Sequence, residues 1–128
     1  MDFGDGDPVR ARPKVLVAED DPSVRLTIEL VLEDEGFEVV LAEDGERALD
    51  IAFTKSLDAI LLDVMMPKLD GEQVFARLRQ DERTAAIPVF VLSGMARDAR
   101  DHWAGAYFVG KPFDPDSLVR SIRKTLQA

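Results

Sequence analysis

The 128-residue sequence contains no cysteine, which excludes disulfide bonds, thiolate catalysis and zinc sites built from cysteines. The absence of cysteine fits a reducing compartment, and we expect a cytoplasmic location. There is one histidine, His102, and a lone histidine in a polar segment is interpreted as a surface side chain. A chain of this length can bury roughly two-thirds of its unfolded surface, so a single domain needs no covalent cross-links.

Long hydrophobic runs and basic runs are also absent. No apolar run approaches the roughly 20 residues that a transmembrane helix needs, and the start MDFGDGDP lacks the features of a signal peptide, so we expect no membrane insertion. The 25 acidic residues outnumber the 16 basic ones and give a net charge of −9. An acidic chain without a basic cluster is not expected to bind nucleic acid, and its charge is explained by solubility alone.

The sequence then divides into an arm and one domain. Residues 1–13 mix Gly, Asp, Arg and Pro and have little to bury, so we expect a flexible N-terminal arm before a domain over residues 14–128. Within the domain, nearly continuous apolar runs are typical of strands covered on both faces. These runs lie at 15–17, 39–41, 60–62, 89–92 and 107–109.

Amphipathic stretches follow the strands, and they predict helices. Asp-Pro pairs at 21–22 and 114–115 are typical helix starts. The pattern MARDARDHWAGA, between the fourth and fifth runs, is weak, so the fourth helix is expected to be short or irregular, with Trp103 serving its packing. Alternating strands and helices predict an α/β fold, namely a doubly wound, five-stranded parallel sheet with helices on both faces.

Polar residues gather where the predicted strands end. The first strand is followed by Glu19 and Asp20, the third ends in Asp63, the fourth in Ser93, and Lys111 follows the fifth. Because ligands of parallel sheets bind beyond the carboxyl ends of the strands, these groups are expected to converge. Converging carboxylates repel one another unless a cation joins them, and oxygen ligands favour a hard ion such as Mg²⁺. Asp63 is then a competent nucleophile for phosphoryl transfer.

Four motifs in this order are similar to those of a known family. The motifs are VLVAEDDPSVR, LLDVMMPKLDG, VFVLSG and GKPF. Together they resemble the receiver domain of two-component response regulators, over residues 14–128. The resemblance implies a flavodoxin-like fold with strand order 2-1-3-4-5, and we interpret the chain as a stand-alone receiver.

The resemblance also implies roles for the strand-end residues. Asp63 matches the phosphoacceptor, and Asp20 matches a direct ligand of Mg²⁺. Glu19 would act on the metal through water, and the backbone carbonyl of Met65 would be a further ligand beside Asp63. Gly71 matches the glycine that lets the loop after the phosphoacceptor turn.

The remaining implied roles concern the response to phosphorylation. Ser93 matches the switch hydroxyl, and Lys111 matches the lysine that contacts the phosphoryl group. The switch aromatic would be Phe108, or its neighbour Tyr107. We also expect the peptide bond between Lys111 and Pro112 to be cis, so that the ammonium turns back into the acidic cluster.

The implied function is to accept a phosphoryl group from a histidine kinase or a histidine phosphotransfer protein, and to switch a surface that binds a downstream protein. The chain would catalyse only its own phosphorylation and dephosphorylation, so it is not expected to be an enzyme. An alternative is an interaction module of the same fold that acts without phosphorylation. A phosphatase of the haloacid dehalogenase type is disfavoured because that class expects a second Asp at the position of Met65.

The sequence departs from the family pattern between Ser93 and Lys111, where it is several residues shorter. A short helix with a weak apolar stripe buries little surface and opens easily. We therefore predict that residues 94–105 are the most mobile part of the core, and that phosphorylation orders them.

Overall fold

The computed structural model describes residues 12–93, 103–111 and 113–127. It contains the strands β2 (Lys14–Ala18), β3 (Glu38–Ala42), β4 (Ala59–Asp63), β5 (Val89–Ser93) and β6 (Tyr107–Gly110), and the helices α1 (Pro22–Asp34), α2 (Gly45–Thr54), α3 (Gly71–Gln80) and α4 (Pro115–Gln127). Four predictions fall wholly or mostly outside the described residues: the flexible arm, the short or irregular helix between β5 and β6, the mobile segment 94–105 with His102, and the isomer of the bond to Pro112.

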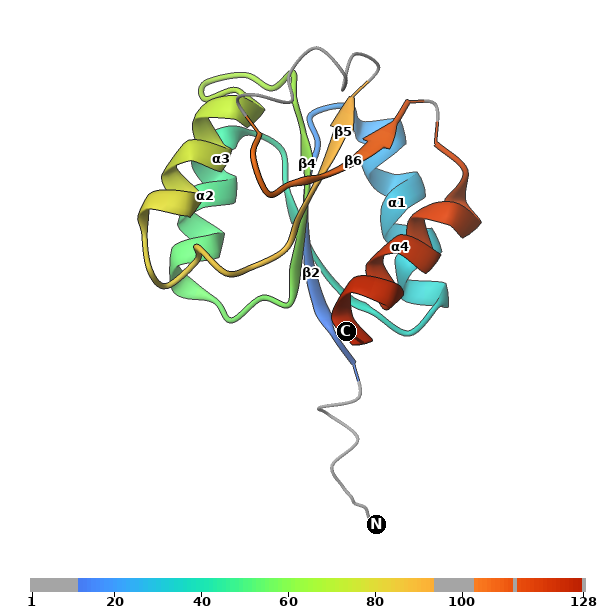
Figure 1. Cartoon of the computed structure of the whole chain (residues 1–128). Helices are drawn as coiled ribbons and strands as arrows, with labels where there is room; N and C mark the ends of the chain where they lie inside the picture. Colours follow the sequence, from blue (N-terminus) through green and yellow to red (C-terminus); the bar gives the residue numbers. More distant parts are fainter. Residues whose placement is uncertain (1–11, 94–102, 112, 128) are drawn as a thin grey trace.

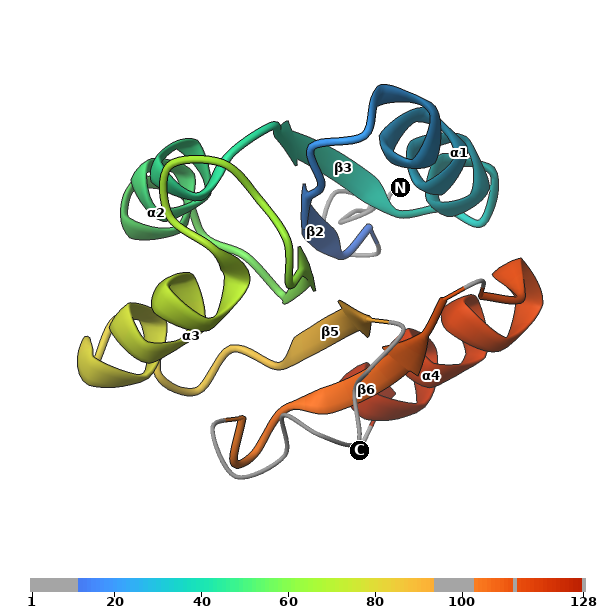
Figure 2. The ribbon, with the colours of Figure 1, turned by 90° about the horizontal axis from the view of Figure 1, so that it is seen from above.

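The five strands form one parallel sheet in the order β3-β2-β4-β5-β6. Numbered by appearance in the chain this order is 2-1-3-4-5, so the predicted topology is confirmed. Helices α2 and α3 cover one face of the sheet, and α1 and α4 cover the other (Figures 1 and 2). None of the helices within the described residues is both long and apolar enough to span a membrane.

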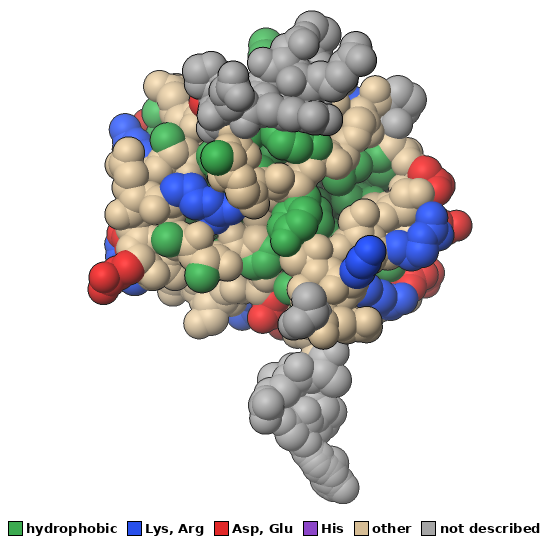
Figure 3. All heavy atoms as spheres, viewed as in Figure 1, with side chains coloured by type: hydrophobic (Ala, Val, Ile, Leu, Met, Phe, Trp, Pro, Cys, Tyr) green, Lys and Arg blue, Asp and Glu red, His purple; other side chains and the backbone are tan. Residues whose placement is uncertain are grey.

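Two hydrophobic clusters, one on each face of the sheet, make up the core. The central strand β4 is buried at all five positions, as its continuous apolar run predicts. The two edge strands differ from the prediction, because most of β3 is only half-buried and β6 has two half-buried and two exposed residues. Each edge strand has one neighbour, so its side chains are covered less completely than those of a central strand. On the β6 edge, Tyr107 is 47% exposed, and hydrophobic side chains are visible on this face of the molecule (Figure 3).

Trp103 fills the core beside this edge. Its side chain is 1% exposed, and its ring centroid lies 5.1 Å from that of Phe75 on α3. The residue belongs to the cluster that α2 and α3 form on their face of the sheet. Trp103 is therefore a packing residue of the core, while its expected packing for the fourth helix concerns a segment outside the described residues.

Helix starts follow the signals in the sequence. Asp21 precedes α1, and its side chain accepts hydrogen bonds from the backbone N–H groups of Ser23 and Val24. Asp114 accepts from the backbone and the hydroxyl of Ser117 in the first turn of α4. Because these caps satisfy N–H groups that lack partners within the helix, they fix where each helix begins beyond the strand ends.

Candidate functional site

The predicted metal and phosphoryl site residues lie where the parallel strands have their carboxyl ends. Glu19 and Asp20 directly follow β2, and the backbone N–H of Glu19 bonds to Ala42 at the end of β3. Asp63 is the last residue of β4, and Ser93 is the last of the adjacent strand β5. Parallel pairing aligns the carboxyl ends of these strands, so residues far apart in the sequence come together as predicted.

Lys111 joins this cluster from the end of β6. Its Nζ donates to Oδ1 of Asp63 at 2.9 Å and to Oε1 of Glu19 at 3.2 Å. Its backbone N–H donates to the carbonyl of Ser93 at 3.3 Å, which extends the pairing of β5 with β6. Burial lowers the pKa of Lys111, but the hydrogen bonds and charges of Asp63 and Glu19 outweigh this effect, and the net pKa is raised. The ammonium is therefore fully charged at neutral pH.

Glu19 is buried next to two charged groups. Burial raises the pKa of its carboxyl, and the negative charge of Asp63 raises it further. Hydrogen bonds from the backbone N–H of Asp21 and from Lys111 oppose the rise without cancelling it. The net rise means that burial, together with the charge of Asp63, outweighs the stabilisation that Lys111 and the Asp21 N–H give to the ionised carboxylate.

The acidic cluster fits a divalent cation. Carboxylate oxygens of Glu19, Asp20 and Asp63 all lie within 4.8 Å of one another. When all three carboxylates are ionised, the single charge of Lys111 leaves two negative charges, which is the charge that Mg²⁺ would balance. Glu19 and Asp63 are buried and Asp20 is exposed, so a metal here would face solvent on the Asp20 side. Oxygen-only ligands and an open side are the features that Mg²⁺ prefers.

The loop after Asp63 packs very tightly. A Cβ atom at Gly71 would lie 2.4 Å from the carbonyl oxygen of Asp63 and 2.8 Å from the Cα of Val64. The backbone N–H of Gly71 donates to the carbonyl of Val64 at 2.9 Å. The expectation that Gly71 lets this loop turn is compatible with this close approach, because α3 begins directly against the end of β4. The φ of Gly71 is not positive, so the need for glycine comes from the lack of space for a Cβ atom.

The two candidate switch aromatics lie on opposite faces of β6. Phe108 packs against the cluster formed with α2 and α3, where Trp103 also lies. Tyr107 stacks on Phe90, with ring centroids 5.0 Å apart and an interplanar angle of 22°. Neither placement tests the switch role, which stays a prediction for Phe108 or Tyr107 together with Ser93.

Sequence reasoning missed several residues around the site. Arg25 on α1 donates to the backbone carbonyls of Glu19 at 2.8 Å and Asp20 at 3.4 Å, and so holds the loop that carries the acidic pair. Asp44 and Lys68 form an ion pair that joins α2 to the loop after Asp63. The available signal was the Asp-Gly pair at the start of α2, which indicates a cap but does not reveal its partner.

The parallel sheet with this strand order, and the acidic cluster and lysine at its carboxyl edge, define a signalling domain of the receiver type. The model of the response regulator receiver domain family matches residues 15–123, and the chain belongs to this family. Domains of this family generally act as signalling modules rather than as enzymes.

Solved structures support the same conclusion. The chain resembles the receiver domain of the sensor histidine kinase PA1611 from Pseudomonas aeruginosa, with 30% identity, a TM-score of 0.85, and coverage of 91% of this chain and 99% of that one. That protein holds a magnesium ion in its active site cleft. A putative response regulator from Chloroflexus aurantiacus is 33% identical, with a TM-score of 0.85 and coverage of 91% and 99% of the two chains.

Curated relatives are longer proteins. The DNA-binding dual master transcriptional regulator RpaA of Synechocystis is 37% identical over 120 residues, which cover 90% of this chain and 49% of that protein. The probable transcriptional regulator ycf27 of Cyanophora paradoxa is 39% identical over 121 residues, which cover 91% and 49% of the two chains. This chain therefore spans about half the length of these relatives.

Proposed function

We propose that this receiver domain accepts a phosphoryl group on Asp63, in a Mg²⁺-dependent reaction, from a histidine kinase or a histidine phosphotransfer protein. The observation that carries the proposal is the position of Asp63, a buried carboxylate held 2.9 Å from a lysine ammonium beside two further acids. A buried aspartate is costly unless charged partners surround it, and here those partners suit phosphoryl transfer.

In the proposed reaction a carboxylate oxygen of Asp63 attacks the phosphorus of a phosphohistidine. The bond from phosphorus to the imidazole nitrogen breaks, and its electron pair leaves with the imidazole, which then takes a proton. Lys111 stabilises negative charge on the transferring group, because its ammonium already lies against Asp63. Ser93 would offer its hydroxyl to a phosphoryl oxygen from the adjacent strand.

The metal would be held by Asp20, Asp63 and the carbonyl of Met65, with Glu19 acting through water. When bound, Mg²⁺ supplies positive charge that neutralises the acids and the phosphoryl oxygens. Arg25 and the strand ends keep the acidic pair in place for this purpose.

We further propose that the phosphorylated domain switches a surface for a downstream protein, through Ser93 and Phe108 or Tyr107. RpaA is named as a DNA-binding regulator, and it is about twice as long as the present chain. Because the 128 residues of this chain carry a net charge of −9, a protein partner is favoured over nucleic acid for the domain itself. We place the reaction in the cytoplasm, which fits a chain without cysteine.

The experiment is incubation with acetyl phosphate and Mg²⁺, followed by intact mass measurement. We expect the wild-type protein to gain one phosphoryl mass, and to gain none when a chelator removes the metal. Asp63→Asn should abolish the gain, and Asp20→Asn should slow it. An Asp63→Asn protein that gains the same mass at the wild-type rate would show that the phosphoacceptor is another residue.

A further inference from the structure

The loop between β4 and α3, residues 64–70, carries the proposed metal ligand Met65 and is fixed at both ends. Near its start, the backbone N–H of Val64 donates to the carbonyl of Leu92 at 3.4 Å. At its end, Gly71 donates to the carbonyl of Val64 at 2.9 Å. The middle of the loop lies against the N-terminus of α2, although the loop connects β4 to α3 and not to α2.

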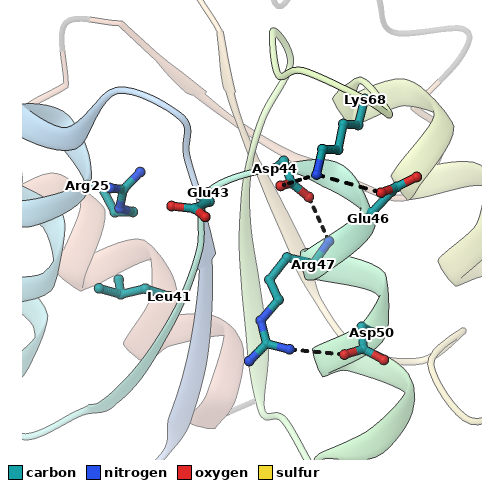
Figure 4. Close-up of a pocket in the computed structure, with 8 residues that line it drawn as sticks. All are labelled: Arg25, Leu41, Glu43, Asp44, Glu46, Arg47, Asp50 and Lys68. Carbon is teal, nitrogen blue, oxygen red and sulfur yellow. Dashed lines mark hydrogen bonds and ion pairs between the residues drawn. The ribbon is translucent and has the colours of Figure 1, made fainter.

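Asp44 provides one side of this contact, and its two carboxylate oxygens have different partners (Figure 4). Oδ1 accepts a hydrogen bond of 2.8 Å from the backbone N–H of Arg47 and caps α2. Oδ2 lies 3.5 Å from Nζ of Lys68 in the loop, which is also 3.9 Å from Oε1 of Glu46. The Asp44 side chain is only 13% exposed, so this carboxylate is held in one place while it faces the lysine.

Lys68 has a left-handed backbone conformation, with φ of 69°. A residue with a Cβ atom adopts this conformation only at a cost in free energy, so surrounding contacts must hold it. The ion pairs with Asp44 and Glu46 are contacts of this kind.

Gly45, at the start of α2, also contacts the loop. A Cβ atom at this position would lie 2.0 Å from the carbonyl oxygen of Leu69, and the backbone N–H of Gly45 is 3.5 Å from the carbonyl oxygen of Pro67. The loop therefore packs directly on the helix backbone, and any side chain at position 45 would push it away.

We infer that Asp44 and Lys68 are positioning residues for the metal site. Their ion pair holds the left-handed turn of the loop against α2, and so keeps the carbonyl of Met65, three residues before Lys68, where it can bind Mg²⁺. This inference rests on the proposed function. It assigns a role to α2, a helix that carries none of the proposed ligands.

The test is the Mg²⁺ affinity of the full chain, measured by titration calorimetry with the metal alone. Asp44→Asn is a matched variant because asparagine caps helices as well as aspartate does, so only the charge is lost. Lys68→Met removes the ammonium at similar length, and Lys68→Arg keeps it. Unfolding by urea in the absence of metal is measured alongside, so that stability and affinity are separated.

We expect Asp44→Asn and Lys68→Met each to weaken Mg²⁺ binding about threefold, the size expected when a partly exposed ion pair is lost. Long-range charge alone predicts opposite signs, because removing an acid weakens cation binding and removing a lysine strengthens it. The double variant should bind no more weakly than either single variant, since the same contact is lost in each case. Lys68→Arg should keep the wild-type affinity.

Unchanged affinity in Lys68→Met, with or without a loss of stability, would overturn the positioning role and leave an ordinary surface ion pair. Tighter Mg²⁺ binding by Lys68→Met would also overturn the positioning role, because it would show that Lys68 acts on the metal only through long-range charge repulsion. A wild-type protein that binds no Mg²⁺ would refute the proposed function, and the inference with it.

Discussion

Nζ of Lys111 and Oδ1 of Asp63 lie 2.9 Å apart, although 48 positions separate the two residues in the chain. Glu19, from a third strand end, is bonded to the same ammonium. The lysine thus contacts two buried acids at once, and we expect both the stability of the domain and its proposed chemistry to depend on this arrangement. We therefore expect substitutions of the charged residues, and of the residues that pack around them, to change the stability of the domain, its labelling by a phosphodonor, or both.

Removal of the Lys111 charge should destabilise the metal-free protein. Breaking a buried ion pair typically costs 3–5 kcal/mol, and because Lys111 is 30% exposed we expect Lys111→Met to lose a smaller amount, about 1–2 kcal/mol. Mg²⁺ should restore part of this loss, since it would neutralise the same acids. Urea unfolding with and without metal measures both effects. Lys124→Met, at an exposed lysine of α4, is the control and should change little.

Trp103 should contribute strongly to stability, because it is buried against Phe75. Removing a large buried aromatic side chain costs about 3–5 kcal/mol, so we expect a loss of this size in Trp103→Ala and a smaller one in Trp103→Phe. Leu30→Ala, at a leucine that is 57% exposed, should cost far less. Unfolding followed by circular dichroism measures all three variants. Equal losses in Trp103→Ala and Leu30→Ala would contradict the packing role.

Gly71→Ala should damage both the fold and the site. The added methyl group would meet the carbonyl oxygen of Asp63 at 2.4 Å, so α3 or the end of β4 must move. We expect a loss of about 1–3 kcal/mol and slower labelling of Asp63 by acetyl phosphate. Gly110→Ala is a matched control, because nothing lies within 4 Å of a Cβ atom there. If both variants behave like the wild type, the close approach at Gly71 is not needed.

The Asp44 charge should make stability depend on pH. The hydrogen bond from the Arg47 backbone is the main cause that lowers the pKa of Asp44 below 3.8 in the folded protein. A lowered pKa means that the ionised group stabilises the fold above pH 3.8, and that this contribution disappears as the pH falls through the folded value. Asp44→Asn should therefore be less stable than the wild type at neutral pH, and the difference should shrink as the pH falls below 3.8 and through the lowered pKa of the folded protein. Urea titrations across this range measure it, and a constant difference would refute the assignment.

Much of the fold could be predicted from local patterns. The continuous apolar run that became β4, the Asp-Pro helix starts and the alternation of strands with helices each depend on residues close together in the chain. Their physical causes, burial of strand side chains and capping of helix N–H groups, act over a few residues. The partial exposure of β3 and β6 was not predicted, because a run of apolar residues does not say whether a strand lies at the edge of its sheet.

The candidate site, like the fold, was predictable from the sequence only in part. The sequence by itself determined which chemical groups stand at the strand ends, namely the acids at 19, 20 and 63, the hydroxyl at 93 and the lysine at 111, since the ends of parallel strands meet at one edge. Only the tertiary structure decided that Lys111 bridges two of the acids, that α3 begins in contact with Asp63, and that Lys68 lies against Asp44. These contacts join segments distant in the chain, and their distances follow from how helices and loops pack on the sheet, which no local pattern encodes.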